Sequence, residues 1–188
     1  FTLVKGLQLN LKQLPSIYYA LTSIEAATNL ARYDGIRYGN CCEKDYTQNR
    51  MEENRNKGFG WEVKKRILTG NYLLYDNKKN SIKNRIKNLR DEIIENNRKI
   101  FTKTDFLITP TTLETAFDLG TKKNNPDEMY FQDVFLVYAN ICGLPAISIP
   151  LFRHSNGMPF GLHIITIKFN EQELYSFSNY LMHNFVKN

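Results

Sequence analysis

The chain has 188 residues and a formal net charge of +6, with 25 Lys and Arg against 19 Asp and Glu. Its 42% hydrophobic and 23% charged residues are typical of a soluble globular protein, and they exclude a disordered, collagen-like or disulfide-rich chain. No apolar run approaches the roughly 18 residues of a membrane span. The chain opens at Phe1 with neither a start methionine nor a basic leader or signal peptide, so we expect a segment of a longer protein.

The first half of the chain is predicted to be mainly helical. Apolar residues at helical spacing predict a helix that begins at Leu14 and stops near Gly35, a residue able to adopt the left-handed conformation of a helix end. Residues 39–60 are polar and predict a loop with one short helix at most. Two further helices are predicted over residues 62–75 and 81–101.

The positive charge is concentrated between residues 44 and 103, where about 16 basic residues stand against about 8 acidic ones. Such a stretch could bind RNA phosphates. We favour the solvated face of an amphipathic helix, because apolar residues recur there at helical spacing with Lys, Arg and Asn between them. These apolar residues are Ile82, Ile86, Leu89 and Ile93. A basic RNA-binding module is the less favoured hypothesis, since aromatic residues are not interleaved with the basic ones.

In the second half, short apolar runs alternate with helical patterns. The runs predict strands at 105–110, 146–150 and 161–166, the last two separated by a turn at 155–157. Helices are predicted over 133–142 and 172–185, and a loop over 112–128. This order predicts an α/β fold around one sheet, and three strands are few for so much helix. With no repeat and no internal boundary, residues 1–188 are expected to form one domain or part of one.

The cysteines and histidines indicate neither a disulfide framework nor a metal site. Cys41 and Cys42 are adjacent, which favours a reducing compartment. No Cys-x-x-Cys pair is present, and the three histidines lack helical ligand spacing, so a structural zinc site is not expected.

No motif for a nucleophile or a phosphate-binding loop is present. Ser148 alternates with Ile147 and Ile149, so strand packing explains this serine better than nucleophilic chemistry. Arg66 follows a Gly-Phe-Gly loop, where its guanidinium could pair with a carboxylate or lie on a helix surface. Asp133 opens an apolar helix. Its side chain could cap the helix N-terminus, or its carboxylate could face an ammonium group. From the residues alone, the structural role is favoured in each case.

Several blocks of the sequence, in the same order, resemble the amidase signature family. The blocks lie at residues 18–39, 58–70, 109–117, 129–133, 140–150 and 157–174. The resemblance runs from about Leu14 to the end of the chain. The stretch Asn-Leu-Ala-Arg-Tyr-Asp-Gly at 29–35 is similar in particular to the A subunits of glutamyl-tRNA(Gln)/aspartyl-tRNA(Asn) amidotransferases. The chain departs from the family at residues 72–80, and His163 stands where Gln is usual.

The resemblance implies an α/β fold with a mixed β-sheet flanked by helices, of which this chain would be the C-terminal portion. It also implies catalysis by a Ser–cis-Ser–Lys triad in the N-terminal half, so no catalytic residue is expected in this chain. Arg66 would pair with the α-carboxylate of glutamine and Asp133 with its α-ammonium group, while Tyr18 would line the site. This arrangement would direct the side-chain amide of glutamine at a serine outside the chain.

The function implied by the resemblance is that of part of a glutaminase subunit. Such a subunit releases ammonia from glutamine for the conversion of Glu-tRNA(Gln) or Asp-tRNA(Asn) to Gln-tRNA(Gln) or Asn-tRNA(Asn). The implied partners are subunits B and C, with charged tRNA bound through the complex. The implied location is the cytoplasm of a bacterium or the interior of an organelle. ATP and Mg act in the partner, so no cofactor is expected here, and the chain alone is expected to be inactive. The alternatives are another amide hydrolase of the family and a non-catalytic split or remnant subunit.

Overall fold

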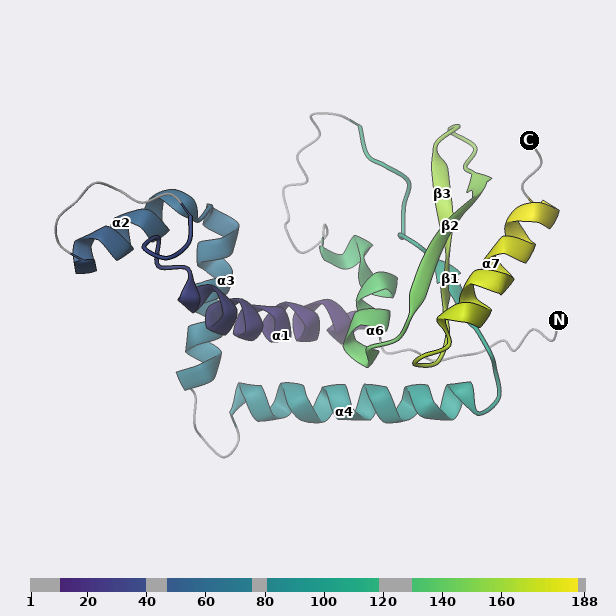
Figure 1. The fold of residues 1–188 in the computed structure, drawn as a ribbon. Helices are drawn as coiled ribbons and strands as arrows, with labels where there is room; N and C mark the ends of the chain where they lie inside the picture. Colours follow the sequence, from purple (N-terminus) through teal and green to yellow (C-terminus); the bar gives the residue numbers. More distant parts are fainter. Residues whose placement is uncertain (1–10, 40–46, 76–80, 119–129, 186–188) are drawn as a thin grey trace. The chain divides into compact units, whose positions relative to one another are not determined.

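A computed structural model describes residues 11–39, 47–75, 81–118 and 130–185 (Figure 1). The chain forms two compact units. The helical unit is Tyr19–Asn88, and the sheet unit is Phe1–Tyr18 with Leu89–Asn188. Cys41, Cys42 and most of the loop predicted over 112–128 lie outside the described residues.

Three helices dominate the first part of the chain. After a short 3-10 turn, η1 (Leu11–Gln13), helix α1 spans Leu14–Asn29 and continues as a second 3-10 turn, η2 (Leu30–Arg32). Helix α2 spans Thr47–Gly58 and α3 spans Trp61–Tyr75. The helices predicted from Leu14 and over 62–75 are confirmed. Helix α2 is 12 residues long, so the polar segment 39–60 contains more helix than its pattern predicts.

Polar contacts explain why α2 has no apolar signature. The Arg55 guanidinium donates to the carbonyl oxygens of Leu30, at 2.8 Å, and Tyr33, at 3.0 Å. The neighbouring Asn54 amide is buried and donates to the carbonyl of Gly35 at 3.1 Å. Gly35 has φ +74°, and its lack of a side chain leaves the space that the Asn54 side chain occupies. Helix α2 is therefore held to the end of η2 by side-chain to backbone hydrogen bonds instead of an apolar stripe.

Helices α1 and α3 approach each other closely at a glycine. Gly70 of α3 is buried, and a Cβ atom at this position would collide with the backbone carbonyl oxygen of Ser23 in α1. It would also lie 2.7 Å from the Cβ of Ala27. Backbone atoms cannot yield as a flexible side chain can, so the crossing of these two helices requires glycine at position 70.

Gly70→Ala should lower the free energy of unfolding by about 2 kcal/mol, because overpacking outweighs the roughly 1 kcal/mol gained in helix propensity. Urea denaturation measures the difference. Gly58→Ala, at a helical glycine of α2, is the matched control, since no atom lies within 4 Å of a Cβ built there. The control should stay within about 0.5 kcal/mol of the wild type. Equal stability of the two variants would show that α1 and α3 do not cross at Gly70.

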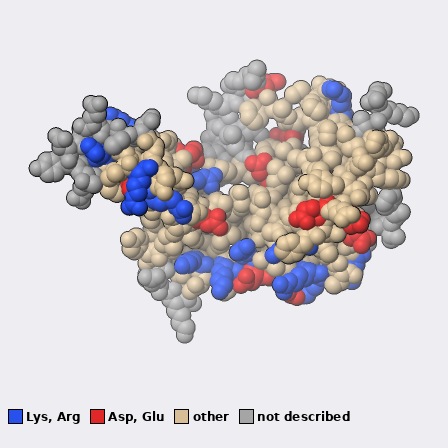
Figure 2. All heavy atoms as spheres, in the orientation of Figure 1, with Lys and Arg blue, Asp and Glu red and all other residues tan. Residues whose placement is uncertain are grey.

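Helix α4 (Ile82–Phe101) fulfils the prediction of an amphipathic helix over 81–101. Ile86 is buried, Leu89 and Ile93 are half-buried, and Ile82 is 42% exposed. The Lys and Arg residues of the helix are exposed, and Figure 2 shows them along its outer side. In its second half, Asn97 is buried and accepts a hydrogen bond of 2.9 Å from the Tyr138 hydroxyl. The basic residues of α4 are therefore the solvated side of a packed helix.

The sheet unit is built on three antiparallel strands. Strand β1 is Leu107–Pro110, β2 is Ala146–Arg153 and β3 is Pro159–Ile165, in the order β1-β3-β2. Helix α6 (Val134–Cys142) precedes β2, and α7 (Glu171–Phe185) follows β3. The α/β class and each of these predicted elements are confirmed. Of the mixed sheet implied by the family resemblance, the described residues contain antiparallel pairs only.

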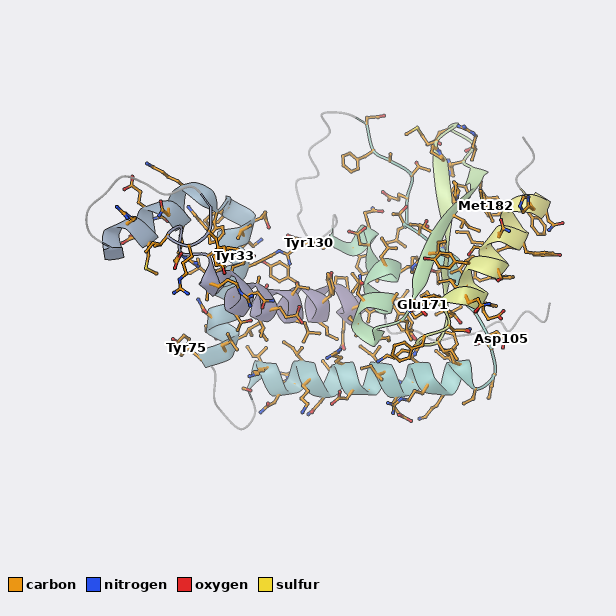
Figure 3. The ribbon with its side chains drawn as sticks, in the orientation of Figure 1. Tyr33, Tyr75, Asp105, Tyr130, Glu171 and Met182 are labelled. Atoms are coloured by element: carbon orange, nitrogen blue, oxygen red, sulfur yellow. The ribbon has the colours of Figure 1, made fainter. Side chains whose placement is uncertain are left out.

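Helix α7 covers one face of this sheet (Figures 1 and 3). Ile149 and Ile164 of the sheet form a buried cluster with Leu174 and Leu181 of α7, and Met182 packs against it. Around this cluster lie further apolar side chains, including Phe106 and Phe177, whose rings stack at 4.4 Å. This apolar contact fixes the register of the strands, because a shift by one residue would turn Ile149 and Ile164 away from α7.

The opposite face of the sheet carries a row of polar side chains. Thr109 and Ser148 are the neighbours of His163 in the strand register, on β1 and β2 respectively. His163 is 2% exposed, and its Nδ1 lies 3.3 Å from the Thr109 hydroxyl. The Ser148 hydroxyl pairs with that of Thr111 at 2.5 Å. Ser148 is therefore a strand residue, as its alternation with isoleucines predicts.

Burial lowers the pKa of His163 below its ordinary 6.5, because the imidazolium form is poorly solvated inside the protein. The unfolded chain therefore takes up a proton at a higher pH than the folded chain does. The free energy of unfolding should fall as the pH drops below about 6.5. His163→Gln should weaken this pH dependence, as followed by denaturation between pH 7 and pH 5. His154→Gln, at an exposed histidine, controls for the loss of an imidazole. An unchanged pH dependence in His163→Gln would contradict the prediction.

Candidate functional site

In the helical unit, Arg66 lies in a cluster formed by α1 and α3. The Arg66 Nη1 donates a hydrogen bond of 2.9 Å to the Thr22 hydroxyl. Its guanidinium carbon lies 4.9 Å from the centre of the Tyr19 ring. Arg66 is half-buried, so part of the guanidinium remains accessible. The side chain is held on two sides by α1, in contrast to an arginine that extends freely from a helix surface.

A second cation shares the Tyr19 ring. The Lys65 Nζ lies 5.8 Å from the ring centre, near the distance limit for a cation–π contact. Next to Thr22, Ser23 is fully buried at the contact with Gly70. Two positive groups of α3 and the Thr22 hydroxyl of α1 together form a surface suited to a carboxylate.

In the sheet unit, Asp133 lies directly before α6. Its carbonyl oxygen accepts a hydrogen bond of 2.9 Å from the Val137 N–H, so the residue occupies the N-cap position that its sequence predicts. Its side chain makes no capping hydrogen bond. The residue is exposed, so its carboxylate can bind a ligand without uncapping the helix.

The residue before Asp133 is tied to the segment that follows β1. The Gln132 side chain donates a hydrogen bond of 3.0 Å to the Glu114 carboxylate. Glu114 lines a cleft of about 510 Å³ that also contains Phe117, His154 and Phe160. One rim of the cleft thus belongs to the segment that is hydrogen-bonded to the residues just before α6.

The three predicted site residues are distributed over both units. Tyr18 is half-buried in α1, at the end of the N-terminal segment of the sheet unit, and Asp133 belongs to the same unit. Arg66 belongs to the helical unit. The geometry brings Arg66 together with Tyr19 and Thr22, two residues that sequence analysis did not select. No sequence pattern links Thr22 to Arg66, which lies 44 residues further along the chain.

The described residues offer little for metal or thiol chemistry. Among residues 11–39, 47–75, 81–118 and 130–185, no group of three His, Cys, Asp or Glu side chains could hold a metal ion. Cys142 is 2% exposed, and burial raises its pKa to about 11, so its thiol stays protonated at neutral pH. None of the helices described is long and apolar enough to cross a membrane.

Comparison with known proteins defines the class. The family model described as Amidase matches residues 1–175, and the chain therefore belongs to the amidase family. Within the family it is similar to the A subunits of glutamyl-tRNA(Gln) amidotransferases. It is 40% identical to the one from Maricaulis maris over 84% of this chain, and 41% identical to the one from Halothermothrix orenii over 88%. The matches cover 32% and 35% of those relatives, so the chain spans about a third of their length.

Solved structures support the same fold. The crystal structure of the glutamyl-tRNA(Gln) amidotransferase A subunit from Thermotoga maritima matches with a TM-score of 0.54 and 25% identity, over 91% of this chain and 33% of that one. A crystal structure described as an amidase matches with a TM-score of 0.71 over 97% of this chain and 38% of the other. At 18% identity, this second match shows the fold alone.

The geometry of Asp133 yields a stability test. Asp133→Ala should change the free energy of unfolding by less than about 0.5 kcal/mol, because no capping hydrogen bond is lost. Ser81 is the matched comparison: it is buried before α4, and its hydroxyl accepts from the Asn84 N–H at 3.2 Å. Ser81→Ala should cost about 1 kcal/mol. Denaturation curves of both variants provide the measurement, and an equal loss would mean that Asp133 serves mainly as a cap.

Proposed function

We propose that this chain is the C-terminal, glutamine-binding part of the A subunit of a tRNA-dependent amidotransferase. The observation that carries the proposal is the identity of about 40%, over 84–88% of the chain, with relatives named as A subunits of glutamyl-tRNA(Gln) amidotransferase. The complete subunit would hydrolyse glutamine to glutamate and ammonia. A partner subunit would then use the ammonia to amidate Glu-tRNA(Gln) or Asp-tRNA(Asn).

In this proposal, the chain supplies groups that recognise the two charges of free glutamine. Arg66 binds the α-carboxylate through paired N–H donors, and Asp133 binds the α-ammonium group. Tyr18 lines the site. Two observations support these roles. Arg66 is held by contacts with Tyr19 and Thr22. The carboxylate of Asp133 makes no capping hydrogen bond to α6. Binding the backbone charges of glutamine fixes the direction of its side-chain amide, which is the group that reacts.

The proposal assigns the bond-breaking step to residues outside this chain, in the Ser–cis-Ser–Lys triad implied by the family. The chain alone would therefore be inactive. The proposed assembly is a heterotrimer with subunits B and C, in the cytoplasm of a bacterium or in an organelle. ATP and Mg would act in the partner subunit, and charged tRNA would be bound through the complex.

The test is ammonia release from glutamine by the complete heterotrimer, with and without charged tRNA. Arg66→Ala should raise the KM for glutamine about 10- to 100-fold, because charge-assisted hydrogen bonds to the carboxylate are lost. Asp133→Asn should also raise it, through the loss of a partner for the ammonium group. Lys57→Ala is the matched control, since Lys57 is an exposed cation of the same unit as Arg66 and pairs with Glu53.

The outcomes separate the proposal from its alternatives. Efficient hydrolysis of simple amides, independent of charged tRNA, would indicate a general amide hydrolase. An assembly that contains this chain but releases no ammonia from glutamine would indicate a non-catalytic subunit. An unchanged KM in Arg66→Ala would remove Arg66 from the site.

A further inference from the structure

The side chain of Arg66 has few orientations open to it, because α1 contacts it from two directions. Thr22 accepts a hydrogen bond from Nη1 at 2.9 Å, and the Tyr19 ring lies 4.9 Å from the guanidinium carbon. Tyr19 and Thr22 are three residues apart, so they lie on the same side of α1. A flexible arginine loses rotamer freedom when it binds a ligand, and a side chain already fixed loses less.

The Thr22 hydroxyl is itself oriented by the backbone. It donates its single proton to the carbonyl oxygen of Tyr19 at 3.2 Å. A hydroxyl has one donor and two acceptor positions, and the Arg66 N–H occupies one of the acceptor positions. The bond from Arg66 is thus directed by the geometry of the helix and does not depend on a freely rotating hydroxyl.

The same contacts leave Arg66 able to bind a carboxylate. A guanidinium carries five N–H donors, and the bond to Thr22 uses one of them. A bidentate carboxylate needs two. The Tyr19 ring adds a favourable contact with the charge without consuming any donor. The cluster therefore orients the guanidinium and keeps enough donors for a ligand.

We infer that Tyr19 and Thr22 are positioning residues, which hold Arg66 in the orientation that binds the α-carboxylate of glutamine. This inference rests on the proposed function of the complete heterotrimer. In this inference, the hydrogen bond to Thr22 sets the direction of the guanidinium, and the Tyr19 ring supports one side of it. Both residues act on substrate affinity through Arg66, and neither takes part in breaking the amide bond.

The experiment compares matched variants in the complete heterotrimer, measured by ammonia release. Thr22→Val keeps the shape and the β-branch but loses the acceptor, and Thr22→Ser restores the acceptor. Tyr19→Leu removes the ring, and Tyr19→Phe keeps it. Each variant is assayed with glutamine and with 4-aminobutanamide, which keeps the ammonium group and the amide but lacks the α-carboxylate.

Thr22→Val should raise the KM for glutamine about fivefold, because a guanidinium that is no longer held loses more rotamer freedom on binding, with kcat changed less than about twofold. Tyr19→Leu should raise it about threefold. Thr22→Ser and Tyr19→Phe should stay within about twofold of the wild type. With 4-aminobutanamide, kcat/KM should be the same for the wild type and every variant, because Arg66 has no carboxylate to bind.

Two results would overturn the inference while leaving the proposed function intact. One is an unchanged KM for glutamine in Thr22→Val and Tyr19→Leu, in an assembly whose wild type releases ammonia. The other is an equal loss with glutamine and with 4-aminobutanamide, which would indicate a structural role. If Tyr19→Leu does not assemble, Thr22→Val against Thr22→Ser decides the question. A wild-type assembly that releases no ammonia would overturn the proposed function, and this inference with it.

Discussion

The contact of Gly70 with the backbone of Ser23 is the constraint on which the geometry around Arg66 depends. Arg66 lies one helical turn before Gly70 on α3, and Thr22 is adjacent to Ser23 on α1. Where the helix backbones approach this closely, the neighbouring turn of α3 lies within reach of Thr22 and Tyr19. A wider crossing would separate the Arg66 guanidinium from the Thr22 hydroxyl, since the side chains would have to span a larger gap. A packing requirement at one glycine thus becomes a condition on the orientation of a charged group.

In the sheet unit, successive side chains of a strand point to opposite faces of the sheet, so one face is apolar and the other carries polar residues. Ile149 and Ile164 face α7. The residue before each of them, Ser148 and His163 respectively, faces the other way. A similar separation holds at Asp133, where the backbone of the N-cap residue meets the needs of α6 and the carboxylate is left for other contacts. In both places the polar side chain takes no part in the apolar packing that the same segment provides.

Much of the fold follows from apolar periodicity, and the exceptions share a physical cause. Helices α3, α4 and α7 and all three strands are predictable because each buries an apolar side. Helix α2 is not, since Asn54 and Arg55 attach it through backbone carbonyls and such bonds leave no periodic signal. Only the family resemblance singles out Arg66 and Asp133 as candidate glutamine-binding residues. The contact of Thr22 with Arg66 spans 44 positions, and no local pattern in the sequence indicates it.

The net charge of the chain bears on how Arg66 would select a carboxylate. The helical unit carries 14 Lys and Arg against 8 Asp and Glu, whereas the sheet unit carries 11 of each, so the whole excess of +6 belongs to the unit that contains Arg66. Exposed charges are screened within about 8 Å at physiological ionic strength, and exposed pairs contribute little to affinity. The surplus therefore acts mainly as a weak, salt-sensitive attraction for anions. In the proposed site, discrimination of a carboxylate from a neutral group would come from short range, through the half-buried guanidinium that contacts Tyr19 and Thr22.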